Sequence, residues 1–440
     1  MKVLKLAAMF AAAMMFCCGA TFAQQLPQLG LYQPEPAKQT AYGSYGSYYA
    51  QDDVASPSDE PPPPGDAPPP PGDAVAGGYA DSCNGCANGC EEEEEDCGCP
   101  CYLFGPDEAV TLFGESNCTG ITAGGWVSFG YHDEQEPLSQ VFGDGLAFND
   151  VPGRFNNHQS WLYIEKATDT EKHCWDWGFR ADILYGTDAQ KTQAFGGTGW
   201  DNDWDHGVYG WALPQAYVEV ARGNLSVKMG HFFTTAGYEV VNATGNFFYS
   251  HGLSHFNSEP FTHTGIVATY ESSEYLTVHA GWTAGWDTGF ENFNDGSNFL
   301  GGFSYKINDD ITFTYVTTAG NFSMRGDNAY YHSAIFNVTL TEKLTYILHN
   351  DVLTVTNIDG FEEDDFAIVQ YLYYWQTDCL GFGGRLEWWK DEGVSHYELT
   401  GGVNIKPHAN LNIRPEIRHD WQPGNQFDVT TFGIDAIVTF

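Results

Sequence analysis

The sequence predicts an all-β protein, a single up-and-down antiparallel transmembrane β-barrel of about 16 strands behind a disordered N-terminal segment. Three observations predict this fold. The chain begins with an apolar leader, apolar and polar residues alternate from about position 117 onward, and the connections between the alternating segments are short and long in turn.

The composition excludes several classes of protein. The 440 residues include 18 Lys and Arg against 58 Asp and Glu, a formal net charge of −40. Nucleic acid is therefore not an expected partner, because phosphate binding needs clustered Lys and Arg. The chain contains 50 glycines, and aromatic residues make up 15% of it. A disordered acidic protein would lack those aromatic residues. This composition is typical of extensive β-structure with long polar loops.

Residues 1–23 have the pattern of a secretory signal peptide. Lys2 and Lys5 precede an apolar run at 6–18, and small residues at Thr21 and Ala23 predict cleavage after Ala23. An uncleaved anchor is the alternative, although the run is short for a spanning helix. The later sequence contains no apolar stretch of about 18 residues, so a membrane-embedded chain must cross with closed strands.

Residues 24–82 predict a disordered linker rich in Pro, Gly and Tyr. The heptapeptide Pro-Pro-Pro-Pro-Gly-Asp-Ala begins at Pro61 and again at Pro68. Such tracts favour polyproline II and act as semi-rigid spacers. The linker is interpreted either as a solvated tether or as a periplasmic arm that reaches the cell wall or a partner.

Residues 83–101 form a cysteine-rich cluster around six consecutive carboxylates. In an oxidising envelope we expect local disulfides, with Zn²⁺ binding at Cys83 and Cys86 as the alternative. Cys118, Cys174 and Cys379 lie near the predicted periplasmic end of the barrel, and we expect two of them to pair, with Cys118 and Cys174 as the favoured couple. The disulfide candidates are Cys83, Cys86, Cys90, Cys97, Cys99, Cys101, Cys118 and Cys174.

Residues 117–440 carry the alternating pattern of the predicted barrel. Phe432, Ile434, Ala436, Val438 and Phe440 share one face of the last segment, opposite a face of mostly polar residues. The pattern recurs at 175–183, 333–340, 382–388 and 411–418. A soluble sandwich would alternate in the same way, so the connections must decide between the two folds.

The predicted connections differ systematically in length. Short ones lie near Asp169–Cys174, Arg222–Asn224, Glu271–Glu274, Asn308–Asp310, Thr341–Lys343, Thr377–Cys379 and Lys406–Ala409. Longer ones lie near His132–Asn157, Gly186–Gly210, Phe232–His263, Ala284–Ser297, Gly320–Ala329, Thr354–Asp364, Asp391–Ser395 and His419–Val429. Short periplasmic turns and long external loops are typical of outer-membrane barrels. Both chain ends are then expected on the periplasmic side.

Aromatic residues gather near the predicted strand ends, for example Trp161, Trp282 and Trp388. They are interpreted as girdles at the membrane interfaces, with a packed aromatic core as the alternative. The terminal Phe440 resembles the C-terminal signature that the barrel-assembly machinery reads in bacterial outer-membrane proteins.

The region from about Asn117 resembles the OmpL-like β-barrel porin family. The stretches that carry the resemblance are Gly124–Ser128, Trp211–Val218 and Val227–Phe232. The resemblance implies an outer-membrane barrel and does not reach the proline-rich linker or the cysteine cluster.

If the apolar residues face lipid, the charged residues between them face the lumen. The candidate pore-lining residues are Arg180, Asp182, Glu219, Lys228, Arg385, Glu387, Glu398, Arg414, Glu416, Arg418 and Asp435. A barrel of about 16 strands is wide enough for an aqueous channel, so we expect a water-filled pore. The alternative is that these charges pair and plug a closed lumen.

No catalytic residue, cofactor or metal is expected. His231, His251, His255 and His263 lie in or beside one long loop that also contains Ser250 and Ser254, but no Gly-x-Ser-x-Gly motif surrounds these serines. The histidines are expected at the surface, with metal contact as the alternative and catalysis by a Ser–His pair the least favoured reading.

The predicted function is passive diffusion of small hydrophilic solutes through a porin-like channel in the cell outer membrane. Acidic external loops predict a preference for cations that falls as salt screens the field. The alternative is a structural or adhesive barrel whose N-terminal arm links to other envelope components. The expected partners are outer-membrane lipid, the barrel-assembly machinery and small solutes, and a homo-oligomer is compatible with the sequence.

Overall fold

The computed structural model describes residues 109–112, 120–133, 148–171, 174–196, 200–356, 360, 362–424 and 428–440. The signal peptide, the linker and the cysteine cluster predicted at 1–101 lie outside the described residues.

The strands are β1 (Ile121–His132), β2 (Asn156–Lys166), β3 (Asp176–Gly186), β4 (Asp205–His206), β5 (Tyr209–Ala212), β6 (Ala216–Arg222), β7 (Leu225–Phe233), β8 (Thr262–Ser273), β9 (Leu276–Thr283), β10 (Ser297–Asn308), β11 (Ile311–Asn321), β12 (Asn328–Thr341), β13 (Leu344–Thr356), β14 (Glu362–Thr377), β15 (Leu380–Asp391), β16 (Val394–His408), β17 (Leu411–Trp421) and β18 (Asp428–Thr439).

Two short helices, α3 (Ala189–Thr192) and α4 (Leu253–Asn257), and two 3₁₀ turns, η1 (Ala243–Gly245) and η2 (Ser323–Arg325), lie in the connections. No helix in the described part of the chain is long and apolar enough to cross a membrane.

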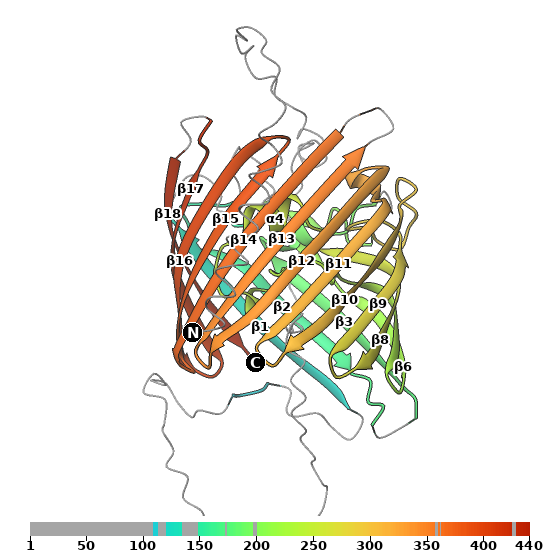
Figure 1. Ribbon diagram of the computed structural model, residues 1–440. Helices are drawn as coiled ribbons and strands as arrows, with labels where there is room; N and C mark the ends of the chain where they lie inside the picture. The colour runs from blue at the N-terminus through green and yellow to red at the C-terminus, as the bar shows by residue number, and fades with distance from the viewer. Residues whose placement is uncertain are drawn as a thin grey trace, which may run out of the picture.

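Sixteen strands form the closed wall of an antiparallel barrel (Figure 1). The other two do not add to the ring, because β5 and β6 lie end to end beside β3, and β4 pairs only with β5. The last strand, β18, closes on β1, where Trp126 is opposite Thr439. At this seam Gly125 and Phe440 exchange two backbone hydrogen bonds of 2.9 and 2.7 Å. The predicted closed all-β ring is confirmed.

The outer face of the wall is apolar and the inner face is polar. On β17 and β18, Ile417 is 59% exposed and Phe432 is 41% exposed, whereas the intervening Arg418 and Asp435 are almost fully buried. A soluble sandwich would bury the apolar set and expose the charged set. Period-two alternation alone does not show whether the apolar face contacts lipid or a protein core. Burial of the charged face inside a closed ring shows that the apolar face points outward, as in a membrane barrel.

The connections follow the predicted alternation with two exceptions, one of which is the nine-residue connection between β2 and β3 that was predicted as short. At one end of the barrel, two residues join β6 to β7, β8 to β9, β10 to β11, β12 to β13, β14 to β15 and β16 to β17. The C-terminus lies at this end (Figure 1). The long connection predicted at Asp391–Ser395 is wrong, because Glu392 and Gly393 form a two-residue turn. Their positive φ values, 44° and 91°, suit the tight turn of a twisted hairpin.

The predicted pair of Cys118 and Cys174 is also wrong. Cys174 lies exposed just before β3 and its thiol is free, while Cys118 lies outside the described residues. Cys379, in the turn between β14 and β15, is buried.

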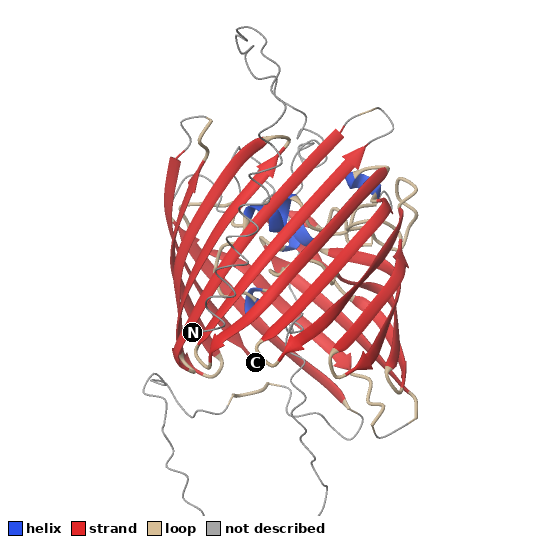
Figure 2. Cartoon of the chain, in the orientation of Figure 1, coloured by secondary structure: helices blue, strands red, loops and turns tan. Residues whose placement is uncertain are grey.

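One long connection lies inside the ring. Residues 234–261 join β7 to β8 and are called the inner loop here; they contain η1 and α4 (Figure 2). Phe248 packs on Ile335 and Tyr373 of the wall, and Leu253 packs on Trp389. These contacts form a small apolar core within the barrel and fix where the loop crosses it.

Candidate functional site

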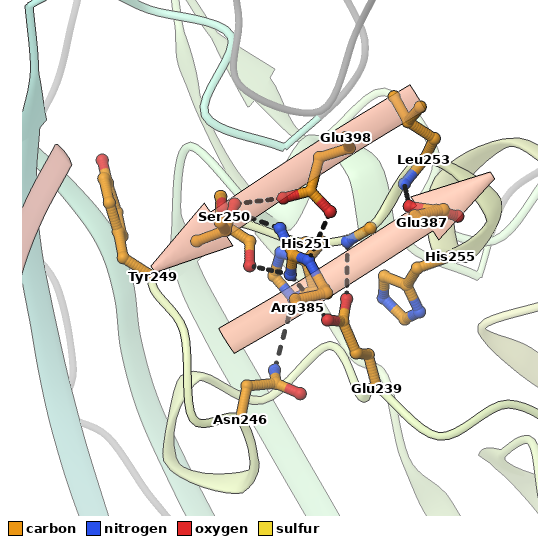
Figure 3. A network of polar contacts seen from close by, with 12 residues as sticks. Glu239, Asn246, Tyr249, Ser250, His251, Leu253, His255, Arg385, Glu387 and Glu398 are labelled. Atoms are coloured by element: carbon orange, nitrogen blue, oxygen red, sulfur yellow. Dashed lines mark hydrogen bonds and ion pairs between the residues drawn. The ribbon is translucent and has the colours of Figure 1, made fainter. Parts of the chain in front are cut away.

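The candidate functional site is the contact between the inner loop and the far wall, β15 to β18. An irregular loop inside a barrel carries backbone N–H and C=O groups that need partners. Here charged side chains of the wall supply many of those partners. Figure 3 shows the centre of this contact, where Arg385 and Glu398 point toward the loop.

Arg385 of β15 makes the largest number of these contacts. Its Nη1 donates to Glu239 Oε1 at 2.7 Å and to the Ser250 carbonyl oxygen at 2.8 Å. Its Nη2 donates to Ser250 Oγ at 3.0 Å, and its Nε donates to Glu398 Oε2 at 2.8 Å. Arg385 is 0% exposed, so these charge-assisted bonds act in a dry environment where they are strong.

Two further arginines bind loop carbonyl groups. Arg414 donates to the carbonyl oxygens of Ala243 at 2.9 Å and Asn246 at 2.7 Å, and it pairs with Asp435. Arg418 donates to the carbonyl oxygen of His251 at 2.5 Å. Arg418 also pairs with Asp420, so each guanidinium joins a wall carboxylate to the loop backbone.

Two wall carboxylates bind the loop amides. Glu416 accepts from the backbone N–H groups of Tyr249 at 2.8 Å and Ser250 at 3.2 Å. Glu387 accepts from Leu253 at 2.6 Å and Ser254 at 2.8 Å. These are the first amides of α4, which the helix itself leaves without partners. The wall therefore satisfies donors and acceptors of the same loop.

Three ionisable groups of the inner loop, Glu239, His251 and His255, have pKa values far from neutral pH. Burial would raise the pKa of Glu239, but the Arg385 guanidinium, His251 and His255 and the Gly252 amide outweigh it and lower the pKa to about 2. Burial lowers the pKa of His251 to about 3 and that of His255 to about 4. At neutral pH the loop thus presents an anionic Glu239 and neutral imidazoles.

A second group of charged residues lies on β2, β3, β6 and β7. Arg180 donates to Asp182 at 2.8 Å and to Glu165 at 2.8 Å. The Lys228 ammonium lies 4.4 Å from the centre of the Tyr217 ring. Glu219 is half-buried and lies opposite Lys228 in the strand register. This group has two cationic and three acidic side chains, and none of its described hydrogen bonds reaches the inner loop.

The structure thus divides the eleven predicted pore-lining residues between two sites. It brings seven of them together around the inner loop: Arg385, Glu387, Glu398, Arg414, Glu416, Arg418 and Asp435. The expectation that such residues face water is not met at the loop, since Arg385, Glu387, Glu398 and Arg418 are all 0% exposed. The reason is that the loop covers them.

No signal in the sequence indicates Glu239. This residue of the inner loop binds Arg385, yet it lies between residues without any strand pattern. The sequence indicates Ser250 only as part of a Ser–His pair, whereas this residue accepts from Arg385. The expectation of surface histidines is wrong. His231, His251, His255 and His263 are all nearly fully buried, because their segment packs inside the ring. Of the described residues, Glu259, His349 and Asp351 form the group whose geometry could hold a metal ion.

The comparisons with known proteins agree with this geometry. Residues 120–440 match the family model described as "Putative beta-barrel porin-2, OmpL-like". The chain belongs to this family. The family resemblance predicted from the sequence is confirmed, and the match covers the whole described barrel. A search of curated proteins finds no match.

Solved outer-membrane proteins share the fold of this family member at low sequence identity. OmpT of Vibrio cholerae, solved in a trimer form, is 12% identical with a TM-score of 0.50, over 73% of this chain and 99% of that one. The channel DcaP of Acinetobacter baumannii is 10% identical with a TM-score of 0.50, over 75% and 100%. The anion-selective porin of Comamonas acidovorans is 9% identical with a TM-score of 0.50, over 73% and 99%. The protein is thus a porin-like barrel of the outer membrane.

Proposed function

We propose that this porin mediates passive diffusion of small hydrophilic solutes across the outer membrane and that the inner loop sets the width of the path. The observation that carries the proposal is the polar, charged inner wall of a closed sixteen-strand ring, crossed by a loop bound to one side. A barrel of this size without such a loop would leave a wide aqueous channel.

A preference for cations is part of the proposal. Each wall arginine at the inner loop is paired with a wall carboxylate, as Arg414 is with Asp435. Glu387 and Glu416 are additional carboxylates that bind only loop groups among the described contacts. With a formal net charge of −40 for the chain, this balance favours cations near the path. The anion-selective relative shares only the fold, so its selectivity does not transfer.

A homo-oligomer is also proposed. The Vibrio cholerae OmpT structure is described as a trimer. The mass of the detergent-solubilised particle, compared before and after heating in denaturant, tests this proposal. A particle of three chains supports it, and a single chain contradicts it.

A structural barrel is the second candidate. The inner loop covers Arg385, Glu387, Glu398 and Arg418, and this burial favours the structural candidate. Charged side chains that are paired and buried do not line a water-filled path for ions. Liposome swelling with sugars of graded size separates the two candidates. A channel admits sugars up to a sharp size limit, and a structural barrel admits none.

The selectivity is tested by the reversal potential across a planar bilayer under a salt gradient. If the channel prefers cations, the reversal potential has the sign expected when cations carry most of the current. The magnitude of this potential should fall as the mean salt concentration rises. A potential of the opposite sign would contradict the proposed preference and leave the channel itself in place.

A further inference from the structure

A separate group of buried polar side chains joins the inner loop to β13. Glu259 follows α4 in the inner loop, and His349 and Asp351 lie two residues apart on one face of β13. One ligand atom from each of the three lies within 4.8 Å of the other two. All three side chains are nearly fully buried.

The distances within the group are short. His349 Nε2 lies 2.9 Å from Asp351 Oδ1 and 3.9 Å from Glu259 Oε1. Ser333 Oγ lies 2.9 Å from the same imidazole nitrogen. His255 Nδ1, from α4, lies 3.3 Å from Glu259 Oε2. The group thus gathers imidazole and carboxylate atoms from the loop and from the wall at one point.

The group contains no guanidinium or ammonium partner for its two carboxylates among the described contacts. Asp351 contacts His349 and accepts from the Tyr331 hydroxyl at 2.6 Å, and Glu259 contacts His255, while the Arg385 guanidinium binds Glu239 and Glu398 instead. Asp351 is 1% exposed, and its Oδ2 accepts no hydrogen bond from any residue that the structure describes. Buried charges are retained in proteins when all their lone pairs are satisfied. A cation at this point would supply the charge and the missing partner together.

We propose that Glu259, His349 and Asp351 bind a divalent transition-metal ion of the zinc class. Imidazole nitrogen and carboxylate oxygen are ligands that such ions accept, and three protein ligands leave a position for water. Ligand atoms about 2.1 Å from a tetrahedral ion lie about 3.4 Å from one another. The distances from His349 Nε2 to Asp351 Oδ1 and to Glu259 Oε1 are 2.9 and 3.9 Å, so each of these two needs to change by only about half an ångström. His255 is placed to hold the Glu259 carboxylate from behind, as metal-bound carboxylates usually require.

The bound ion would tie the inner loop to β13, on a part of the wall that the arginine contacts at β15 to β18 do not reach. Metal binding then stabilises the loop in its inserted position. Its effect on conductance rests on the proposed channel function, whereas binding itself does not.

The test uses the full-length protein in detergent. After metal removal it is titrated with Zn²⁺ by calorimetry and with Co²⁺ by absorption, because cobalt held by nitrogen and oxygen lacks the intense near-ultraviolet bands of cobalt–thiolate sites. This separates the proposed site from the N-terminal cysteines. Wild type should bind one Co²⁺ per chain with no thiolate bands. Glu259→Gln and Asp351→Asn should each weaken that binding at least tenfold.

His263→Gln is the matched control, because it changes a buried histidine beside the inner loop that makes no described contact with the group. It should bind the metal as wild type does. Migration on unheated gels shows which variants keep the folded barrel. If Glu259→Gln or Asp351→Asn misfolds, metal binding by the other variant still tests the proposed site. Equal binding by wild type and the folded variants, or no thiolate-free site in wild type, overturns the proposal.

A bilayer recording completes the test. Zn²⁺ should reduce the conductance of wild type and leave that of Glu259→Gln unchanged. If wild type forms no channels at all, the proposed function is contradicted. The Zn²⁺ and Co²⁺ titrations still test the metal site in that case, because they do not depend on conductance.

Discussion

Arg385 of β15 and Glu239 of the inner loop form an ion pair of 2.7 Å across 146 residues of sequence. Both side chains are nearly fully buried, and the same Arg385 nitrogen also donates to the Ser250 carbonyl oxygen. Arg385 therefore binds the inner loop both at a loop side chain and at the loop backbone.

Replacing Arg385 should release the inner loop. Arg385→Ala leaves Glu239 and Glu398 buried without their partner, and breaking a buried pair in this way costs about 3–5 kcal/mol. We expect a larger and noisier single-channel conductance and a lower unfolding temperature. Arg222→Ala is the control, since Arg222 is exposed beside a turn. Conductance identical to wild type in Arg385→Ala would show that this pair does not hold the loop.

The loop should loosen in acid. The pKa of Glu239 is lowered to about 2 in the folded protein, below its ordinary value of 4.5. A lowered pKa stabilises the folded state above the ordinary value, and this contribution is lost as pH falls from about 4.5 toward 2. Conductance fluctuations should therefore grow over this range in wild type. Glu239→Gln should show similar fluctuations at neutral pH and a weaker dependence on pH; an unchanged acid response in this variant would exclude Glu239 as its source.

Glu387 should protect the start of α4. Its carboxylate accepts from the amides of Leu253 and Ser254. Glu387→Gln replaces one acceptor oxygen by a donor and should cost about 1.5–3 kcal/mol locally. Hydrogen exchange of these two amides is expected to accelerate at least tenfold, whereas the exposed Glu342→Gln should have no effect. Equal protection in both variants would argue that the apolar packing of Leu253 alone holds α4.

The strands could be predicted from the sequence because their signal is local. Ile417 and Arg418 are adjacent in a strand, so their side chains point to opposite faces of the wall. The apolar Ile417 lies on the outer face and the charged Arg418 on the inner face. The turn at Glu392 and Gly393 was missed because a polar Lys-Asp-Glu-Gly stretch looks the same in a tight turn and in a longer loop. Its two positive φ values are visible only in the structure.

The position of the inner loop could not be predicted in the same way. Its contacts join residues far apart in sequence, such as Arg414 with Ala243 across 171 residues and Glu416 with Tyr249 across 167. Alternation placed Arg414 and Glu416 on the inner face of the wall. Nothing in a period-two pattern indicates that a loop between β7 and β8 crosses the ring to meet them.

The end of the chain should matter for closure. Phe440 exchanges two backbone hydrogen bonds with Gly125 at the seam between β18 and β1. Deleting Phe440 removes both bonds, and we expect a lower yield of protein that migrates as folded barrel on unheated gels. Phe440→Tyr keeps the backbone bonds and an aromatic ring, so it should assemble normally. An equal yield from the deletion and wild type would show that the seam closes without these bonds.

Shortening the inner loop tests the central claim most directly. Residues 238–257 would be replaced by two glycines, and single-channel conductance would be recorded beside that of wild type and of a barrel trimmed at 422–427, between β17 and β18. If the inner loop sets the width of the path, the first variant conducts several-fold more than wild type and admits larger sugars, while the second conducts as wild type does. Unchanged conductance and an unchanged sugar limit after loss of the inner loop would contradict the account.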